Sequence, residues 1–171
     1  LVSPIGSATT EGRAVNFFPL NHSVARRYQQ IHSDLGAGPF RFTKLSFRPD
    51  GSTVPLTFTG SRALVCELFM GFGVAYDRVS RAFADNYVGL RTRVITRKRV
   101  NLGPVTVNAR PAPFTIDLVL DTPFAFGGPQ SLVWELVVYS NVLNGDRWPG
   151  IDAQMGSYRY GVGARLGRGC Q

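Results

Sequence analysis

The residue types that most often catalyse reactions or bind metals are few in this chain and widely spaced. The only histidines are His22 and His32, and neither stands at a metal-ligand spacing from another ligand. No CxxC, HExxH, EF-hand, GxSxG or P-loop pattern occurs. The Gly71-Phe72-Gly73 segment lacks the third glycine and the helix of a dinucleotide site. We therefore expect neither a bound metal nor a cofactor.

The carboxylates are equally dispersed. Asp117 and Asp121 share one face of an expected strand, but they lie about 13 Å apart along an extended chain. That separation is too large for the acid pair of a glycosidase unless another strand contributes. We expect that the protein is not an enzyme, and we assign no catalytic residue.

The strongest charge pattern is a row of arginines at strand spacing. Its members are Arg91, Arg93, Arg97 and Arg99, with Ile95 between the two pairs. In an extended strand they project from one face over roughly 26 Å. Arginine forms bidentate contacts with carboxylates and phosphates, so the row suits an acidic polysaccharide, another polyanion or a neighbouring subunit. A solvated face that discourages edge-to-edge aggregation is the alternative.

Aromatic residues near the C-terminus offer a possible sugar contact. Trp148 lies in an expected loop, and Tyr158 and Tyr160 follow it. Exposed aromatic rings stack on sugar rings, whereas a loop tryptophan that folds back would only plug the core. The sequon that begins at Asn21 is a possible N-glycosylation site in a cell that glycosylates proteins.

The two cysteines, Cys66 and Cys170, are far apart in the sequence. A disulfide between them would close a long loop, which is worth roughly 3 to 5 kcal/mol in the chain-entropy model. Such a bond is typical of secreted proteins. The alternative is that Cys66 is simply a small buried residue on the apolar face of its strand.

Short alternating runs between proline- and glycine-marked turns predict the architecture. In one such run Trp134 alternates with Leu132 and Leu136, so we expect this tryptophan in the core. The expected strands are residues 26–33, 40–48, 54–58, 63–74, 90–102, 104–108, 114–121, 132–140 and 158–166. Residues 77–84 have the spacing of one or two helical turns. The pattern predicts an all-β, jelly-roll-like antiparallel β-sandwich with one short helical segment. We expect an N-terminal arm of residues 1–12 and a single domain of residues 13–171.

Composition agrees with a single globular domain. The chain has 171 residues, of which 44% are apolar and 12% aromatic, enough for a sizeable core. Its formal net charge is +8, and of the 19 basic residues only Lys44 and Lys98 are lysines. A GC-rich genome would produce the same excess of arginine. No apolar run is long enough to span a bilayer, and the start at Leu1 is typical of a mature chain whose leader has been removed.

Several short motifs occur in an order shared with a known group of proteins. They are residues 7–12, 82–89, 111–114, 122–124, 132–141 and 167–170. In these motifs the chain resembles uncharacterised secreted β-sandwich domains of bacteria such as planctomycetes. The resemblance implies secretion and a jelly-roll-like sandwich, and it supplies no catalytic residue. In many of those proteins the closing glycine–cysteine element leads into further sequence, which implies that the native chain can continue past Gln171.

We expect a non-catalytic structural subunit of an extracellular or cell-surface assembly, such as a filament, tube or sheath, with copies of itself as partners. Val2 and Ile5 would anchor the arm on a neighbouring subunit, and the arginine row would form a second contact. The arm would then be ordered only in the polymer. The alternative is a secreted carbohydrate-binding module that binds a surface polysaccharide through the arginines and the aromatic residues named above. Neither nucleic-acid binding nor membrane insertion is expected.

Overall fold

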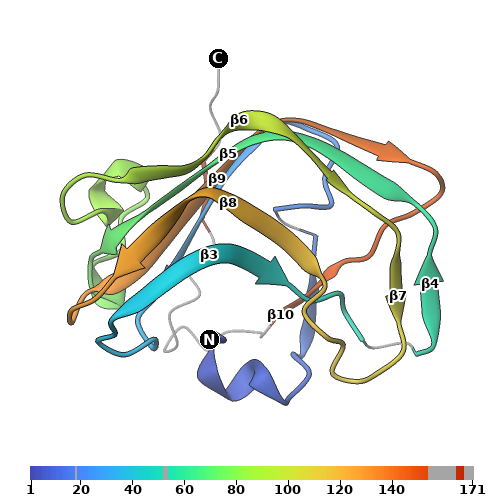
Figure 1. Cartoon of the computed structure of the whole chain (residues 1–171), viewed down its shortest axis with the longest axis horizontal. Helices are drawn as coiled ribbons and strands as arrows, with labels where there is room; N and C mark the ends of the chain where they lie inside the picture. Colours follow the sequence, from blue (N-terminus) through green and yellow to red (C-terminus); the bar gives the residue numbers. More distant parts are fainter. Residues whose placement is uncertain (18, 52–53, 154–164, 168–171) are drawn as a thin grey trace.

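A computed structural model describes residues 1–17, 19–51, 54–153 and 165–167 (Figure 1). This part of the chain contains eleven strands and three short 3-10 turns. The strands are β1 (Ala14–Asn16), β2 (Arg26–His32), β3 (Phe40–Phe47), β4 (Leu56–Phe58), β5 (Ser61–Gly73), β6 (Thr92–Leu102), β7 (Val105–Val107), β8 (Ile116–Phe126), β9 (Ser131–Asn144), β10 (Ile151–Ala153) and β11 (Arg165–Gly167). None of the helical segments among the described residues has the length and apolar character needed to cross a membrane.

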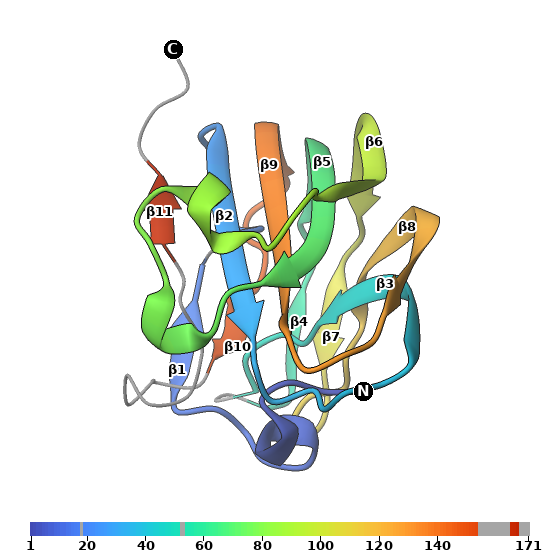
Figure 2. The same cartoon turned by 90° about the vertical axis from the view of Figure 1, so that its left-hand side faces the viewer.

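The largest layer is a five-stranded antiparallel sheet in the order β11-β2-β9-β5-β6 (Figure 2). Its long strands alternate as the sequence predicts, because successive side chains of a strand point to opposite faces. One face packs into the core through residues such as Leu68, Leu136 and Trp134. The opposite face, which we call the outer face, carries Glu67 and Glu135.

Strands β3 and β8 form a separate antiparallel pair that packs on the inner face of this sheet. The ring of Phe47 on β3 meets Trp134 edge-on at 5.8 Å between centroids. Trp134 is only 1% exposed, as expected for a core residue. The pairs β4–β7 and β1–β10 extend the structure. The all-β sandwich is therefore confirmed, while the jelly-roll connectivity stays a prediction.

The helical segment consists of two separate 3-10 turns, η2 (Tyr76–Arg78) and η3 (Phe83–Asn86). Residues 76–90 cross the outer face in front of β2 and β9 (Figure 2). Two backbone bonds attach this segment to the end of β5, from Val74 N to Asn86 O and from Val88 N to Phe72 O. Phe83 is buried against the sheet. The segment therefore covers part of the outer face.

The N-terminal segment folds onto its own chain and contains a third turn, η1 (Ile5–Ala8). Buried Arg48 holds it, because its guanidinium donates to the carbonyl oxygens of Ser7 and Thr10 and pairs with Asp152. The amide of Ile5 donates to Asp34 Oδ2 at 2.9 Å. The expectation that residues 1–12 are ordered only in a polymer is thus wrong: this segment completes the body of a single chain.

Candidate functional site

The four arginines of the row, Arg91, Arg93, Arg97 and Arg99, are exposed on β6 and the residue before it. We call them the arginine face. Aromatic rings of the outer face support three of them. The guanidinium carbons of Arg91 and Arg93 lie 4.0 and 5.6 Å from the ring centroid of Phe69. That of Arg97 lies 3.9 Å above the ring of Tyr139. Such stacking restricts these long side chains while their N–H groups stay accessible.

The two halves of the arginine face differ in electrostatics. Arg91 pairs with Glu135 at 2.7 Å, and Arg93 pairs with Glu67 at 3.3 Å. Arg97 and Arg99 have no carboxylate partner among the residues that the structure describes. Arg99 Nε donates to the side-chain oxygen of Asn101, at 3.2 Å. The half of the face around residues 97–99 therefore carries the uncompensated positive charge.

Glu135 is a fully buried carboxylate at the other end of this surface, with a side chain that is 0% exposed. It accepts hydrogen bonds from Arg27 at 2.6 Å, Arg91 at 2.7 Å and the hydroxyl of Tyr87 at 3.2 Å. Burial is the main cause of the raised pKa of Tyr87, and the negative charge of Glu135 raises it further. The Tyr87 hydroxyl therefore stays protonated and donates. The cluster fixes residues 76–90 on the sheet. It is a satisfied structural network.

A serine, a histidine and an aspartate meet at the N-terminal segment, but their hydrogen bonds exclude a catalytic triad. The indole nitrogen of Trp134 can only donate, so Nε2 of His32, at 2.8 Å, accepts. The proton of the neutral ring is then on Nδ1, which donates to Ser3 Oγ at 2.6 Å. The Ser3 hydroxyl in turn donates to Asp34 at 2.5 Å. His32 therefore cannot take the proton of Ser3, as a general base must.

Burial reinforces this assignment, because it lowers the pKa of His32 to about 4.

A cavity of about 490 Å³ adjoins this chain of hydrogen bonds. Tyr28, Phe47, Met70 and Trp134 supply its apolar lining. Its lining comes from several elements, so no local pattern in the sequence could have shown it. Rings with a few polar groups are the usual lining of small-molecule pockets.

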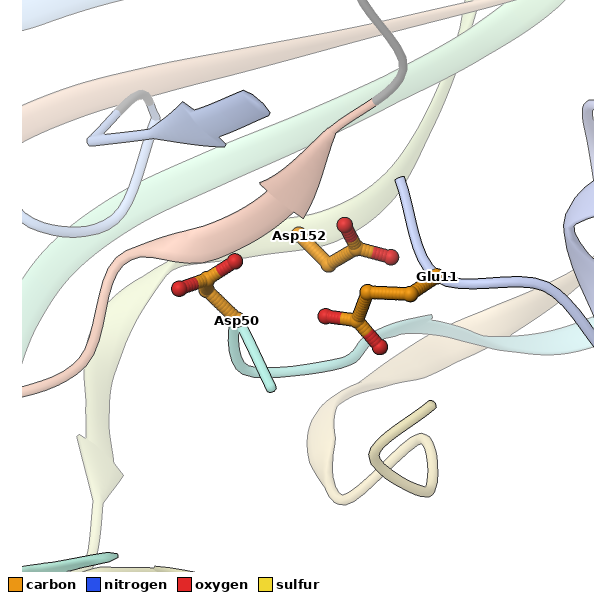
Figure 3. A group of neighbouring side chains, drawn as sticks. All are labelled: Glu11, Asp50 and Asp152. Atoms are coloured by element: carbon orange, nitrogen blue, oxygen red, sulfur yellow. The ribbon is translucent and has the colours of Figure 1, made fainter. Parts of the chain in front are cut away.

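Three carboxylates meet where the N-terminal segment, the turn after β3 and β10 come together (Figure 3). They belong to Glu11, Asp50 and Asp152, and one oxygen from each lies within 4.8 Å of the others. Each of two glycine amides holds one of them: Gly51 N donates to Glu11 Oε1 at 2.6 Å, and Gly12 N donates to Asp152 Oδ1 at 2.9 Å. The sequence analysis did not identify this acidic cluster. The only local signal is that two of the acids directly precede glycines.

Trp148 does not form the sugar contact that its expected loop position suggested. Its side chain belongs to the core and is 3% exposed. Its indole nitrogen donates to Gly103 O at 3.0 Å, which satisfies the one polar atom that burial would otherwise penalise. Of the two alternatives that the sequence left open, the exposed stacking ring is wrong, and the loop tryptophan that folds back into the core is confirmed. Tyr158 and Tyr160, the other members of that set, lie outside the described residues.

The sequon residue Asn21 is occupied by internal contacts. Its Nδ2 donates to the carbonyl oxygens of Trp148 and Pro149, and its Oδ1 accepts from Arg62. A glycan on Nδ2 would break these bonds, so the structure does not favour glycosylation there.

The proposed arm anchors differ from each other. Val2 is half-buried and lines the cavity, whereas Ile5 is exposed on η1.

Cys66 is fully buried and free among the described residues. Burial raises the pKa of its thiol to about 11, so it is a poor nucleophile. Cys170 lies outside the described residues, and the disulfide stays a prediction.

Comparisons with known proteins give no assignment. No family model matches the chain, and neither a curated protein nor a solved structure matches it significantly. The arguments about function therefore depend on the residues and contacts described above.

Proposed function

We propose that this protein is a non-catalytic, extracellular carbohydrate-binding module whose arginine face binds an acidic polysaccharide. One observation carries the proposal. Arg97 and Arg99 are exposed and have no carboxylate partner among the described residues, and Arg97 is held 3.9 Å above Tyr139. Such guanidinium groups are restricted in position and can form bidentate contacts with an arriving carboxylate or sulfate.

A polymer suits this surface better than a small anion. A single ion pair between exposed groups is worth only about 0 to 1 kcal/mol. Useful affinity therefore requires several contacts to form together, and linked charges on one chain provide them through their high effective concentration. The row of arginines along β6 offers this repetition. The net charge of +8 also favours encounters with polyanions.

The extracellular location is supported by the resemblance to secreted bacterial sandwich domains described above. The aromatic site around Trp148, which the sequence suggested for sugars, no longer contributes, because that ring is buried. The binding mode proposed here is thus electrostatic, and it should weaken as ionic strength rises.

Titration with three probes tests the proposal: polygalacturonate, dextran sulfate and neutral dextran. We expect the native protein to bind the two acidic polymers and not the neutral one. The double variant Arg97→Glu/Arg99→Glu should weaken binding at least tenfold. A matched control is Arg13→Glu/Arg110→Glu, which makes the same change in net charge at two exposed arginines on other parts of the chain. If both double variants lose the same affinity, binding follows total charge, and the arginine face is not the site.

A structural subunit remains the second candidate, because an apolar tip stands next to the arginine face. Leu90 is 95% exposed and Val88 is 49% exposed, immediately before Arg91. Exposed apolar side chains of this kind can pack against another copy of the protein. Sedimentation over a wide concentration range tests this role. The native protein should form oligomers and Leu90→Asp should not, whereas a native protein that stays monomeric at the highest concentration would exclude self-assembly.

A further inference from the structure

We propose that the cavity between the N-terminal segment and β3 binds a small, uncharged aromatic molecule. Its volume of about 490 Å³ lies within the roughly 300 to 1,000 Å³ of ligand pockets. The inner face of the five-stranded sheet, β3 and the N-terminal segment line it. Exposed residues such as Leu1 and Thr43 belong to the lining as well, so a ligand can enter from solvent. The cavity is on the opposite side of the sheet from the arginine face and does not depend on the proposed function.

The apolar part of the lining includes rings that can contact a ligand ring. The ring centroid of Trp134 lies 5.4 Å from that of Tyr28 and 5.8 Å from that of Phe47. Tilted and edge-to-face pairs at such separations are favourable, and a further ring in the cavity would extend them. On β3, Phe42, Leu45 and Phe47 pack against the core and are nevertheless only half-buried. A bound aromatic molecule would remove remaining apolar surface of these side chains from water.

One polar side chain of the cavity has no protein partner. Gln30 on β2 lies directly opposite Trp134 on β9, so both side chains project from the inner face of the sheet. Gln30 is half-buried, and no residue that the structure describes hydrogen bonds with its side-chain amide. The next polar group along this face, His32, already bonds Trp134, and on the other side Tyr28 bonds Asn16. Because an amide both donates and accepts, Gln30 can bind a ligand hydroxyl or amide.

The charged groups around the cavity favour an uncharged ligand. Arg48 is buried and pairs with Asp152, and the ammonium of Lys44 pairs with Asp117. Arg41 is exposed, so water solvates its charge. Among the described lining residues, no charged side chain is therefore both buried and unpaired. Moving a ligand charge into such a site without a partner is costly, and an ion should bind more weakly than an uncharged analogue of the same shape.

Calorimetric titration of the full chain with cinnamamide and cinnamate tests this site. The two probes have the same shape, but cinnamamide is uncharged and cinnamate carries a carboxylate in place of the amide. We expect cinnamamide to bind with a Kd of about 10⁻⁵ to 10⁻³ M, as for a ligand of about a dozen non-hydrogen atoms. Cinnamate should bind at least tenfold more weakly. Gln30→Leu should weaken cinnamamide at least fivefold, because the ligand amide loses its partner. Gln130→Leu, the same change at an exposed glutamine, should leave the affinity unchanged.

NMR of the methionine methyl groups locates the probe in the native protein, so the test does not depend on a variant that folds. Cinnamamide should shift the methyl resonance of Met70, which lines the cavity. A resonance that stays unchanged up to millimolar cinnamamide would overturn the proposal. Equal affinities for cinnamamide and cinnamate would overturn the selection of an uncharged ligand. The double variant Arg97→Glu/Arg99→Glu should bind cinnamamide as the native protein does, and a loss of binding there would place the probe on the arginine face instead.

Discussion

Acid should destabilise this protein through one buried histidine. His32 accepts the indole N–H of Trp134 and donates to Ser3, so the folded state holds its neutral form. Its pKa falls from 6.5 to about 4 on folding, chiefly because burial penalises the charged ring. Between these two values the unfolded chain binds a proton that the folded chain does not. The free energy of unfolding therefore falls as the pH is lowered from 6.5 to 4. At about 1.4 kcal/mol per pKa unit, His32 accounts for a loss of roughly 3 kcal/mol over this range.

Urea denaturation at pH 7 and pH 4.5 measures this effect. The native protein should lose roughly 2 to 3 kcal/mol between these conditions through His32. His32→Gln should lose correspondingly less, although it starts from a lower stability because it breaks the bond to Trp134. His22→Gln, the control at the other histidine, should keep most of the pH dependence, because His22 is more exposed. Carboxylates with lowered pKa values, such as Asp121, titrate at lower pH and are common to all three proteins. The reasoning is refuted if native protein and His32→Gln show the same loss.

Three further predictions concern stability and the cysteines. Trp134→Ala and Trp148→Ala should each lower the free energy of unfolding, measured by urea denaturation, by about 3 to 5 kcal/mol, because both rings are buried. A small loss for Trp148→Ala would show that this ring is at the surface. Arg48→Met should lower the free energy of unfolding by about 3 to 5 kcal/mol, because it removes the cation that pairs with the buried carboxylate of Asp152. A near-native Tm would contradict the role of this arginine in holding the N-terminal segment. Non-reducing peptide mapping should recover one cross-link between Cys66 and Cys170, and two thiols that react with iodoacetamide only after denaturation would show that both cysteines are free.

The strands were predictable because their signals are local. Residues 63–74 were expected as a strand, and β5 spans Ser61–Gly73; the run expected at 90–102 corresponds to β6, Thr92–Leu102. Period-two alternation and flanking turn residues act within a few positions, so one sequence suffices to place them. Strands β1 and β10 were missed, because these three-residue strands pair with each other from opposite ends of the chain, which no local pattern shows.

The errors concern contacts between distant residues. Trp148 lies in a loop as expected, but whether its ring folds back could not be decided from the sequence, because the indole meets the carbonyl of Gly103, far away in the sequence. The N-terminal segment looked detachable because its residues are small and polar, but it is attached by contacts with Asp34, Arg48 and Asp152, which lie far away in the sequence. The acidic cluster likewise needs Glu11 and Asp152 to meet across the whole chain. Spacing in one sequence carries no information about such pairs.

The arginine face was visible in the sequence as a row, but its division into two halves was not. Glu67 and Glu135 neutralise one end because β5 pairs with β6, and β9 with β5, in a register that only the fold defines. The resulting difference between Arg93 and Arg97 is what makes the proposed binding surface specific.

Footprinting of the arginines tests the central claim most directly. A dicarbonyl reagent modifies exposed arginines, and mass spectrometry reports the extent at each position with and without polygalacturonate. The account predicts that the polymer protects Arg97 and Arg99 most strongly, while Arg13 and Arg110 react at unchanged rates. Protection spread evenly over all exposed arginines, or confined to Arg13 and Arg110, would contradict it.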